Sequence, residues 1–409
     1  MFVNILDGIK VVDVTAWAFV PSATGVLAHW GADVVKVEST TAPDPMRRGD
    51  LEPGRSAPGF KHYSRGKKSV AINLASPAGQ ELIYRLAADA DVFVTSYLPA
   101  TRRKLKMDVE DIRAVNPNII YVRGSGYGPK GPDAERPGYD HLSWWYRGSL
   151  AQSAMDSADV SWPPNMTGHG DGISGLVLAG GICAALLQRE RTGIASVVDS
   201  SLMGTAVWFQ GMALLGAQAG EAPPRKLGPV ERPKVTGGFP GVSRALMSTY
   251  QTKDYRFLSL CFLGDADRDF VDLCAHLERP DLASDARFVH INERIANSDA
   301  LLAILEECFA SRTLAEWKDI LATARGAWCP ALTPEEILED PQTLANGFVR
   351  YVDYPGGGVK LPIPPILFDE EGGDPPVAPD FAQHTDQVLS GLGCSREEIA
   401  RLRDDGVVV

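Results

Sequence analysis

The sequence predicts an α/β protein with a parallel sheet in a large domain and a second, smaller α+β domain. Three observations support this class. The chain has 409 residues, which is more than one hydrophobic core usually organises. Short β-branched runs alternate with helical patterns over residues 9–124, as in repeated β-α-β units. The composition then changes near Gly220.

The first half of the chain predicts the elements of the sheet in order. Pro21 suits the first turn of a helix, and Gly31 suits its end, with a new strand starting two residues later. The pattern predicts strands at residues 9–14, 33–38, 91–96 and 118–124, and helices at residues 21–31 and 77–88. Ligands of parallel sheets bind beyond the carboxyl ends of the strands. We therefore expect the loops that follow these strands to share one rim.

The second half of the chain predicts the smaller domain. Residues 220–241 carry five prolines and five glycines, which is typical of a linker or an extended loop. Beyond them the pattern predicts a strand at residues 255–262 and helices at residues 265–276, 297–310 and 313–322. Proline-rich segments and a last helix starting near Ser395 follow. We expect a large domain at 1–220, a linker and small domain at 221–330, and a segment at 331–409 that returns to the large domain.

Charge and composition exclude several classes of partner. Lys and Arg total 40 against 52 for Asp and Glu, a net charge of −12, which disfavours nucleic acid or an anionic membrane as partner. Asp7 and Lys10 interrupt the apolar stretch that an export signal would need, so a cytoplasmic protein is expected. The uncharged run 172–188 is shorter than the ~20 residues of a membrane span and predicts a buried helix. The six cysteines form no C-x-x-C pair, so no metal site is expected.

The common nucleotide and hydrolase motifs are missing. The first strand–helix turn, residues 13–21, has no glycine that would let the backbone approach a pyrophosphate, although Glu38 ends the second strand. Neither a G-x-S-x-G elbow nor a Walker-type loop is present. Nicotinamide, flavin, P-loop and serine hydrolase chemistry are therefore disfavoured.

One carboxylate has unusual surroundings. Asp171 lies among four glycines, in the stretch Thr-Gly-His-Gly-Asp-Gly-Ile-Ser-Gly of residues 167–175, immediately before an apolar helix. Asp is a good N-cap, so Asp171 could serve only to cap the helix. The glycines favour a nucleophile instead, because they leave backbone N–H groups unobstructed where an oxyanion would form.

A series of short landmarks runs in order through the chain. They are residues 6–13 (LDGIKVVD), 31–38 (GADVVKVE), 65–70 (RGKKSV), 90–94 (ADVFV), 126–132 (GYGPKGP), 180–186 (GGICAAL), 191–193 (RTG) and 249–254 (TYQTKD). With them the chain resembles the class III coenzyme A (CoA) transferases of the CaiB/BaiF type, whose relatives include the α-methylacyl-CoA racemases. The catalytic aspartate of the family corresponds to Asp171.

The resemblance implies a fold and a reaction. It implies a Rossmann-like large domain made from both chain ends, a small domain from the middle, and two protomers interlocked as a homodimer. It also implies that Asp171 attacks an acyl-CoA thioester to give a mixed anhydride, and that CoA then forms an aspartyl thioester from which it passes to an incoming carboxylic acid. Coenzyme A enters as a substrate, and no further cofactor is expected.

The resemblance also suggests where CoA binds. Basic residues follow the predicted strands, where Arg or Lys commonly grips phosphate, although such clusters can also be solvated surface. The candidates are Arg48 with its neighbours Arg47, Arg65, Lys67 and Lys68, and Arg103 and Lys104 with Arg102. Lys104 aligns with a CoA-binding arginine of the family. Ala18, Ser96 and Tyr97 occupy further contact positions, but formyl-CoA transferases have Gln at the first, and many relatives have Asn-Phe at the other two.

The substrate-side candidates separate a transferase from a racemase. Tyr139 stands in a Gly-Tyr-Asp tripeptide where the racemases have Gly-His-Asp, and tyrosine is a poor base for α-proton exchange near neutral pH. His169, beside Gly170, and His141 could compensate. Gly237 and Gly238 match the glycine-rich flap of formyl-CoA transferases or form a plain inter-domain turn. Two alternatives thus stay open: a racemase, and a catalytically silent acyl-CoA-binding protein.

Aromatic side chains are candidates for the acyl pocket, although aromatics at helical spacing more often serve the core. They are Trp144, Trp145, Trp208 and Phe209. They do not identify the acyl group.

Overall fold

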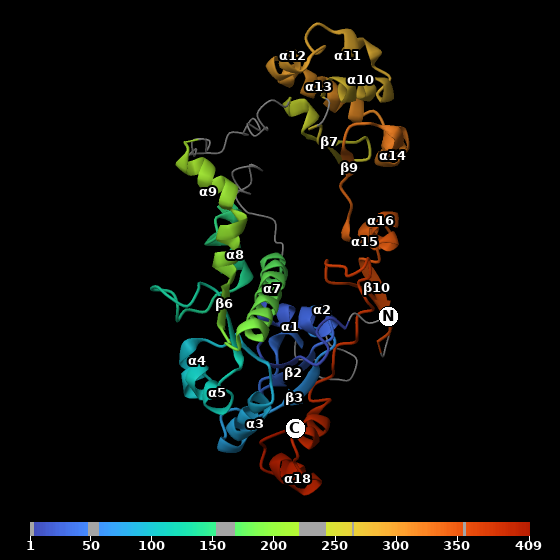
Figure 1. Ribbon diagram of the computed structural model, residues 1–409. Helices are drawn as coiled ribbons and strands as arrows, with labels where there is room; N and C mark the ends of the chain where they lie inside the picture. The colour runs from blue at the N-terminus through green and yellow to red at the C-terminus, as the bar shows by residue number, and fades with distance from the viewer. Residues whose placement is uncertain (1–3, 48–56, 153–167, 221–242, 264–265, 355–356) are drawn as a thin grey trace. The chain divides into compact units, whose positions relative to one another are not determined.

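The computed structural model describes residues 4–47, 57–152, 168–220, 243–263, 266–354 and 357–409 (Figure 1). The chain divides into two compact units. The first contains Met1–Glu231 and Pro341–Val409, and the second contains Arg232–Asp340. The sequence analysis placed the corresponding boundaries after residues 220 and 330.

The first unit is built on a six-stranded sheet, and the predicted α/β class is confirmed. Every neighbouring pair of strands is parallel, and their order is β3-β2-β1-β4-β5-β6. The strands are β1 (Lys10–Val14), β2 (Asp33–Glu38), β3 (Lys68–Ala71), β4 (Val92–Thr95), β5 (Ile120–Ser125) and β6 (Val197–Ser201). The four predicted strands are β1, β2, β4 and β5, which are rich in β-branched residues buried on both faces.

Helices cover both faces of this sheet. On one face lie α1 (Phe19–His29), α7 (His169–Thr192) and α8 (Leu202–Phe209), and on the other lie α3 (Pro77–Ala88) and α5 (Val109–Val115). The unit also contains α2 (Pro58–Tyr63), α4 (Pro99–Lys104) and α9 (Gly211–Gln218), and the short helices η1 (Pro45–Arg47) and η2 (Asp140–Tyr146). The predicted helix at 77–88 matches α3. The helix predicted at 21–31 begins earlier, because Ser22 N–H already donates to the carbonyl of Ala18 at 2.8 Å.

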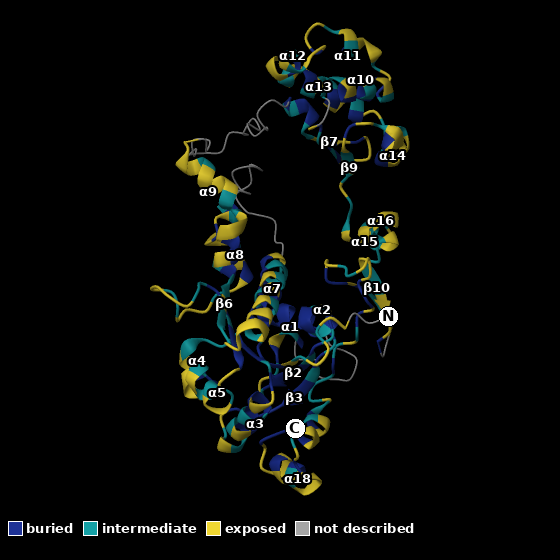
Figure 2. Cartoon of the chain, in the orientation of Figure 1, coloured by how far each residue is buried: buried dark blue, intermediate teal, exposed yellow. Residues whose placement is uncertain are grey.

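Alternate residues of the strands pack into two separate hydrophobic cores, one on each face of the sheet. Val11 and Val92 point into a core shared with α1 and α7, whereas Val12 and Phe93 point into a core that includes α3 and α5. Figure 2 shows strands β2 and β3 and helix α1 as largely buried, whereas β6 at the edge of the sheet is not. The sheet is thus covered on both sides, as β-α-β connections require.

Helix α7 contains the apolar run predicted as a buried helix. It is long and apolar enough to cross a membrane, by length and composition alone. Leu178, Ala179 and Ile182 are nevertheless buried in the core that α7 shares with α1. One face of α7 therefore packs in this core, whereas Val177 and Leu187 are each 50% exposed.

The C-terminal segment lies in the first unit. It contains α16 (Pro341–Ala345), the antiparallel pair β10 (Val349–Val352) and β11 (Val359–Pro362), and helices α17 (Thr385–Gly391) and α18 (Arg396–Asp404). Asn73 N–H donates to the carbonyl of Val407 at 2.8 Å, and His384 N–H donates to that of Ser69 at 2.9 Å. The segment therefore binds β3 and the residues that follow it.

The second unit has its own core. Its antiparallel strands are β7 (Thr249–Gln251), β8 (Phe257–Leu260) and β9 (Trp328–Pro330). Its helices are α10 (Ala266–His276), α11 (Pro280–Ser284), α12 (Ile291–Ala296), α13 (Ser298–Phe309), α14 (Leu314–Ile320) and α15 (Pro334–Ile337). Two short 3-10 turns, η3 (Arg244–Leu246) and η4 (Leu321–Thr323), complete the unit. In this core the ring of Phe309 contacts Tyr250 in a tilted arrangement and Trp317 edge-to-face. The predicted strand and three helices correspond to β8, α10, α13 and α14.

Candidate active site

A cavity of about 1050 Å³ opens at the carboxyl ends of the strands. The loops after the four predicted strands all contribute to its wall, so the prediction of a shared rim is confirmed. The wall is lined by residues 16–20 after β1, 45–46 after β2, 96–98 after β4, and 124–126 at the end of β5. Of the described residues that line the cavity, none is Lys or Arg.

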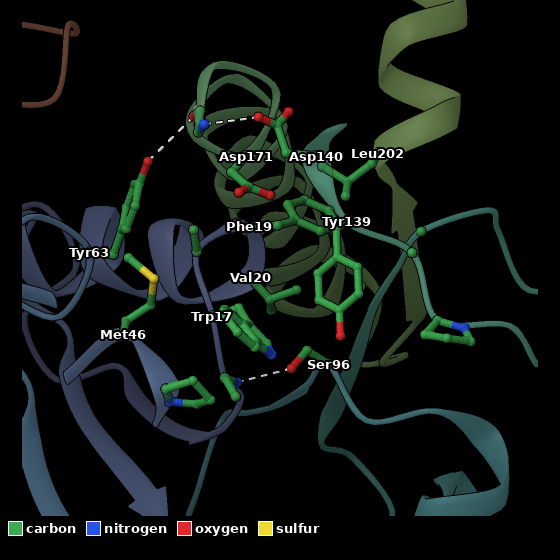
Figure 3. Close-up of a pocket in the computed structure, with 18 of the residues that line it drawn as sticks. Trp17, Phe19, Val20, Met46, Tyr63, Ser96, Tyr139, Asp140, Asp171 and Leu202 are labelled. Atoms are coloured by element: carbon green, nitrogen blue, oxygen red, sulfur yellow. Dashed lines mark hydrogen bonds between the residues drawn. The ribbon is translucent and has the colours of Figure 1, made fainter. Parts of the chain in front are cut away.

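Asp171 lies in the first turn of α7 and lines this cavity (Figure 3). The N-cap of α7 is Gly168, with φ of +80° and without a side-chain capping bond. The reading of Asp171 as the helix cap is therefore wrong, because the helix begins before it. A carboxylate in the first turn is still favoured by the helix dipole.

Glycines let Asp140 approach the start of α7. A Cβ atom at Gly170 would overlap Asp140 Oδ1 and the ring of Trp144. Asp140 Oδ2 accepts a hydrogen bond from Gly168 N–H at 2.9 Å. The Gly172 N–H donates to the Gly168 carbonyl at 2.9 Å, so this N–H group is committed to the helix.

A neighbouring carboxylate perturbs the ionisation of Asp171. Burial, reinforced by the negative charge of Asp140, raises the pKa of Asp171 to about 7. Burial also raises the pKa of Asp140, against the opposing effect of the Gly168 N–H bond. Asp171 therefore changes charge near neutral pH, as expected of a group tuned for chemistry.

The sequence analysis missed a tyrosine on α2 that faces the same turn. Tyr63 Oη donates to the carbonyl of Gly168 at 3.4 Å. Burial, followed by the charge of Asp171, raises the pKa of Tyr63 to about 12, so it stays a neutral donor. Its neighbour His62 also lines the cavity, and burial lowers the pKa of His62 to about 4. The sequence around Tyr63 carried no signal for this role.

Three of the suggested CoA contacts lie in the cavity wall. Ala18 is buried at the N-cap of α1. Ser96 Oγ accepts from Ala16 N–H at 3.0 Å, which joins the loops after β1 and β4. Tyr97, the third, is partly buried against the core that includes α3 and α5.

The suggested cations at α4 lie beside the wall and do not line it. Arg103 and Lys104 are exposed on α4, whose Thr101 lines the cavity. Arg103 also pairs with Glu135 at 3.0 Å.

Three of the suggested cations near β2 and β3, Arg47, Arg65 and Lys67, are buried and bound by groups of the protein, so the structure does not favour them as phosphate ligands. Arg47 pairs with Glu38 at 2.7 Å. Lys67 pairs with Asp13 at 2.9 Å. Burial alone would raise the pKa of Asp13, but the charges of Lys67 and Lys36 lower it to about 2. The other members of the group are also engaged: Arg65 with the carbonyl of Pro362, and Lys68 with Asp33. Arg48 lies outside the described residues.

The remaining candidates are dispersed. Tyr139 lines the cavity and is half exposed, whereas His169 is exposed at the start of α7 and is not among the described lining residues. Gly237 and Gly238 lie outside the described residues. Among the aromatic candidates for the acyl pocket, Trp145 lines the cavity. Trp144 is buried, and Trp208 and Phe209 are exposed on α8 away from the wall.

Comparisons with known proteins agree with this geometry. Residues 6–385 match the model of CoA-transferase family III. The chain is 30% identical to (R)-2-hydroxy-4-methylpentanoate CoA-transferase of Clostridioides difficile, over 99% of each chain. It is 29% identical to cinnamoyl-CoA:phenyllactate CoA-transferase of Clostridium sporogenes, over 98% of this chain and 97% of the relative. A crystal structure of a CaiB/BaiF family protein from Brucella suis superposes with a TM-score of 0.81 at 29% identity, covering 95% of this chain and 99% of that one.

Proposed function

The chain belongs to CoA-transferase family III and is a CoA-transferase, and on that premise we propose that it moves CoA between carboxylic acids through covalent intermediates on Asp171. The observation that carries the proposal is the position of Asp171. Its carboxylate is partly buried, lies in the first turn of a helix and lines the large cavity at the carboxyl ends of the sheet. This is the usual place for ligands in such folds.

The proposed reaction has two symmetric halves. The ionised Asp171 attacks the donor thioester carbon, the C–S bond breaks, and CoA thiolate leaves behind a mixed anhydride. The thiolate then attacks the aspartyl carbonyl, releasing the donor acid and forming an aspartyl-CoA thioester. The acceptor carboxylate attacks that thioester and expels CoA thiolate, giving a second anhydride. Attack of the thiolate on the acceptor carbonyl yields the new acyl-CoA and restores the Asp171 carboxylate.

The neighbours of Asp171 support these steps. Asp140 fixes the turn through the Gly168 N–H, and the absence of a side chain at Gly170 allows that approach. The positive end of the α7 helix dipole lies at this turn, which favours the negative charge of a developing oxyanion. Burial makes the ionised Asp171 less stable than in water, so its attack on a neutral thioester is favoured.

Coenzyme A is proposed to lie along the cavity towards α4. Ala18, Ser96 and Tyr97 line the wall there, and Lys104, with Arg103, is exposed on the adjoining helix. A homodimer and a cytoplasmic location, both expected from the sequence, remain part of the proposal.

The racemase alternative would need a base other than Tyr139, and His141, named above as a possible substitute, also lines the cavity. Tyr139 occupies the place of the racemase histidine and lines the cavity, but an ordinary phenol titrates near ~10. His62, which also lines the cavity, is held neutral at a pKa of about 4. The transferase route needs no such base, since the Asp171 carboxylate is itself the nucleophile.

Deuterium exchange decides between the two reactions. The protein is incubated in deuterium oxide with 2-methylbutyryl-CoA, with and without an acceptor acid, and the acyl-CoA is analysed by mass spectrometry. We expect new acyl-CoA only with the acceptor, and no deuterium at C2. Deuterium at C2 without acceptor, lost in Asp171→Ala, would establish the racemase instead.

A further inference from the structure

Trp17 adopts a backbone conformation that is unusual for a large side chain. Its φ is +70°, a region in which non-glycine residues are strained. Two hydrogen bonds hold the strained turn. Trp17 N–H donates to Asp44 Oδ1 at 3.1 Å, and the preceding amide, Ala16 N–H, donates to Ser96 Oγ at 3.0 Å.

The support beneath Trp17 is buried and charged. Asp44 is buried and pairs with the buried Lys36 at 2.8 Å. Lys36 Nζ also donates to the carbonyl of Thr15 at 2.9 Å, in the same turn. Buried ion pairs of this kind resist rearrangement, because breaking one leaves an uncompensated charge. The turn is therefore held in a single conformation.

This conformation presents the indole to the cavity beside another ring (Figure 3). Trp17 and Tyr139 are each 47% exposed. Their ring centroids lie 5.6 Å apart at an interplanar angle of 81°, an edge-to-face pair. Other apolar side chains complete this part of the wall: Phe19, Val20, Met46 and Leu202. Aromatic surface left half exposed in a concave site is typical of ligand recognition.

The aromatic pair lies close to the nucleophile. Tyr139 directly precedes Asp140, whose carboxylate accepts from Gly168 in the turn that carries Asp171. Among the described residues of the cavity wall, the carboxyl groups are those of Asp140 and Asp171. A substrate with a second carboxylate would meet like charge in a partly buried site, where repulsion is stronger than in water.

We infer that the acyl groups transferred are aryl-bearing monocarboxylates, and that Trp17 is a specificity-determining residue that contacts their ring. The inference rests on the proposed function, because it assumes that the acyl group lies beside Asp171. An aromatic contact of this kind corresponds to a preference of roughly three- to tenfold.

Donor competition tests the inference without altering the CoA part of the substrate. Phenylacetyl-CoA, acetyl-CoA and succinyl-CoA are compared by kcat/KM with 3-phenylpropionate as acceptor. The wild-type protein should prefer phenylacetyl-CoA over both others. Trp17→Gly removes the indole and accepts a positive φ; it should lower the phenylacetyl-to-acetyl ratio roughly three- to tenfold. Trp17→Phe should keep most of the preference.

Tyr255→Gly is a matched control, because Tyr255 also has a positive φ of 59°, is 80% exposed and lies in the second unit. It should leave the ratio unchanged. If Trp17→Gly lowered kcat/KM equally for phenylacetyl-CoA and acetyl-CoA, the indole would contact the CoA part of the substrate, and the inference would be overturned. A wild-type preference for acetyl-CoA or succinyl-CoA would also overturn it, even if the variant failed to fold. Transfer from none of the three donors would instead contradict the proposed function.

Discussion

The carboxylate of Asp140 lies beside the first turn of α7, and its negative charge adds to burial in raising the pKa of Asp171 to about 7. Asp140 is itself fixed by the Gly168 N–H at 2.9 Å. Structure and ionisation at this turn are therefore linked, because the residue that positions the nucleophile also determines how readily it ionises.

The first prediction concerns pH. Attack on the thioester needs ionised Asp171, and a raised pKa means that this form is scarce below about 7. The kcat/KM for the acyl-CoA donor should therefore rise with pH through about 7 and then level off. In Asp140→Asn, the amide oxygen still accepts from Gly168, but the like charge is gone. The midpoint should move to lower pH and yet stay above 3.8, because burial is the larger cause.

The measurement is the initial rate of labelled CoA transfer at low donor concentration over a pH series. A rate independent of pH around neutrality, or a midpoint that moves upward in Asp140→Asn, would contradict the coupling.

The second prediction concerns two glycines of the same helix. Gly170→Ala places a methyl group against Asp140 Oδ1 and the Trp144 ring, so it should displace the turn and reduce kcat by at least about tenfold. Gly180→Ala is the matched control, since a Cβ there meets nothing within 4 Å. It should keep activity and stabilise the helix by up to about 1 kcal/mol. Kinetics and thermal denaturation of both variants check this; equal kcat values would show that the approach of Asp140 is unimportant.

The third prediction concerns the basic residues of α4. Lys104→Ala should weaken the binding of free CoA at low ionic strength and have less effect at high ionic strength, because exposed charge interactions are screened by salt. Lys253→Ala, an exposed lysine of the second unit, provides the control. Calorimetric titrations at two salt concentrations measure the effect. An unchanged affinity of Lys104→Ala at low salt would mean that this cation belongs to the solvated surface.

The strands rich in β-branched residues could be predicted from the sequence, and so could the rim on which the cavity lies. Strands β3 and β6 were missed for a physical reason. β3 is four residues long and begins with Lys68, and β6 reads Val-Val-Asp-Ser-Ser, which is polar over its second half. Their pairing with neighbouring strands stabilises them more than their own composition does.

Only some residues of the candidate site could be predicted from the sequence. Asp171 could be singled out because glycines surround it in the sequence. The roles of Asp44, Tyr63 and Trp17 could not, because each depends on a contact between segments that are distant in the sequence or on an unusual φ value. Arg47 and Lys67 were assigned to phosphate from their charge and their place after a predicted strand, and neither feature reveals the buried carboxylates with which they pair.

The covalent role of Asp171 can be tested most directly by oxygen transfer. In the proposed reaction the acceptor carboxylate supplies the bridging oxygen of the second anhydride, and attack of CoA on the acceptor carbonyl leaves that oxygen on Asp171. The protein is incubated for a single turnover with acyl-CoA and an ¹⁸O-labelled acceptor acid, and the peptide that contains Asp171 is analysed by mass spectrometry. The account predicts one ¹⁸O in the side chain of Asp171. New acyl-CoA formed without ¹⁸O in that peptide would contradict it, because CoA would then have passed between the acids without a bond to Asp171.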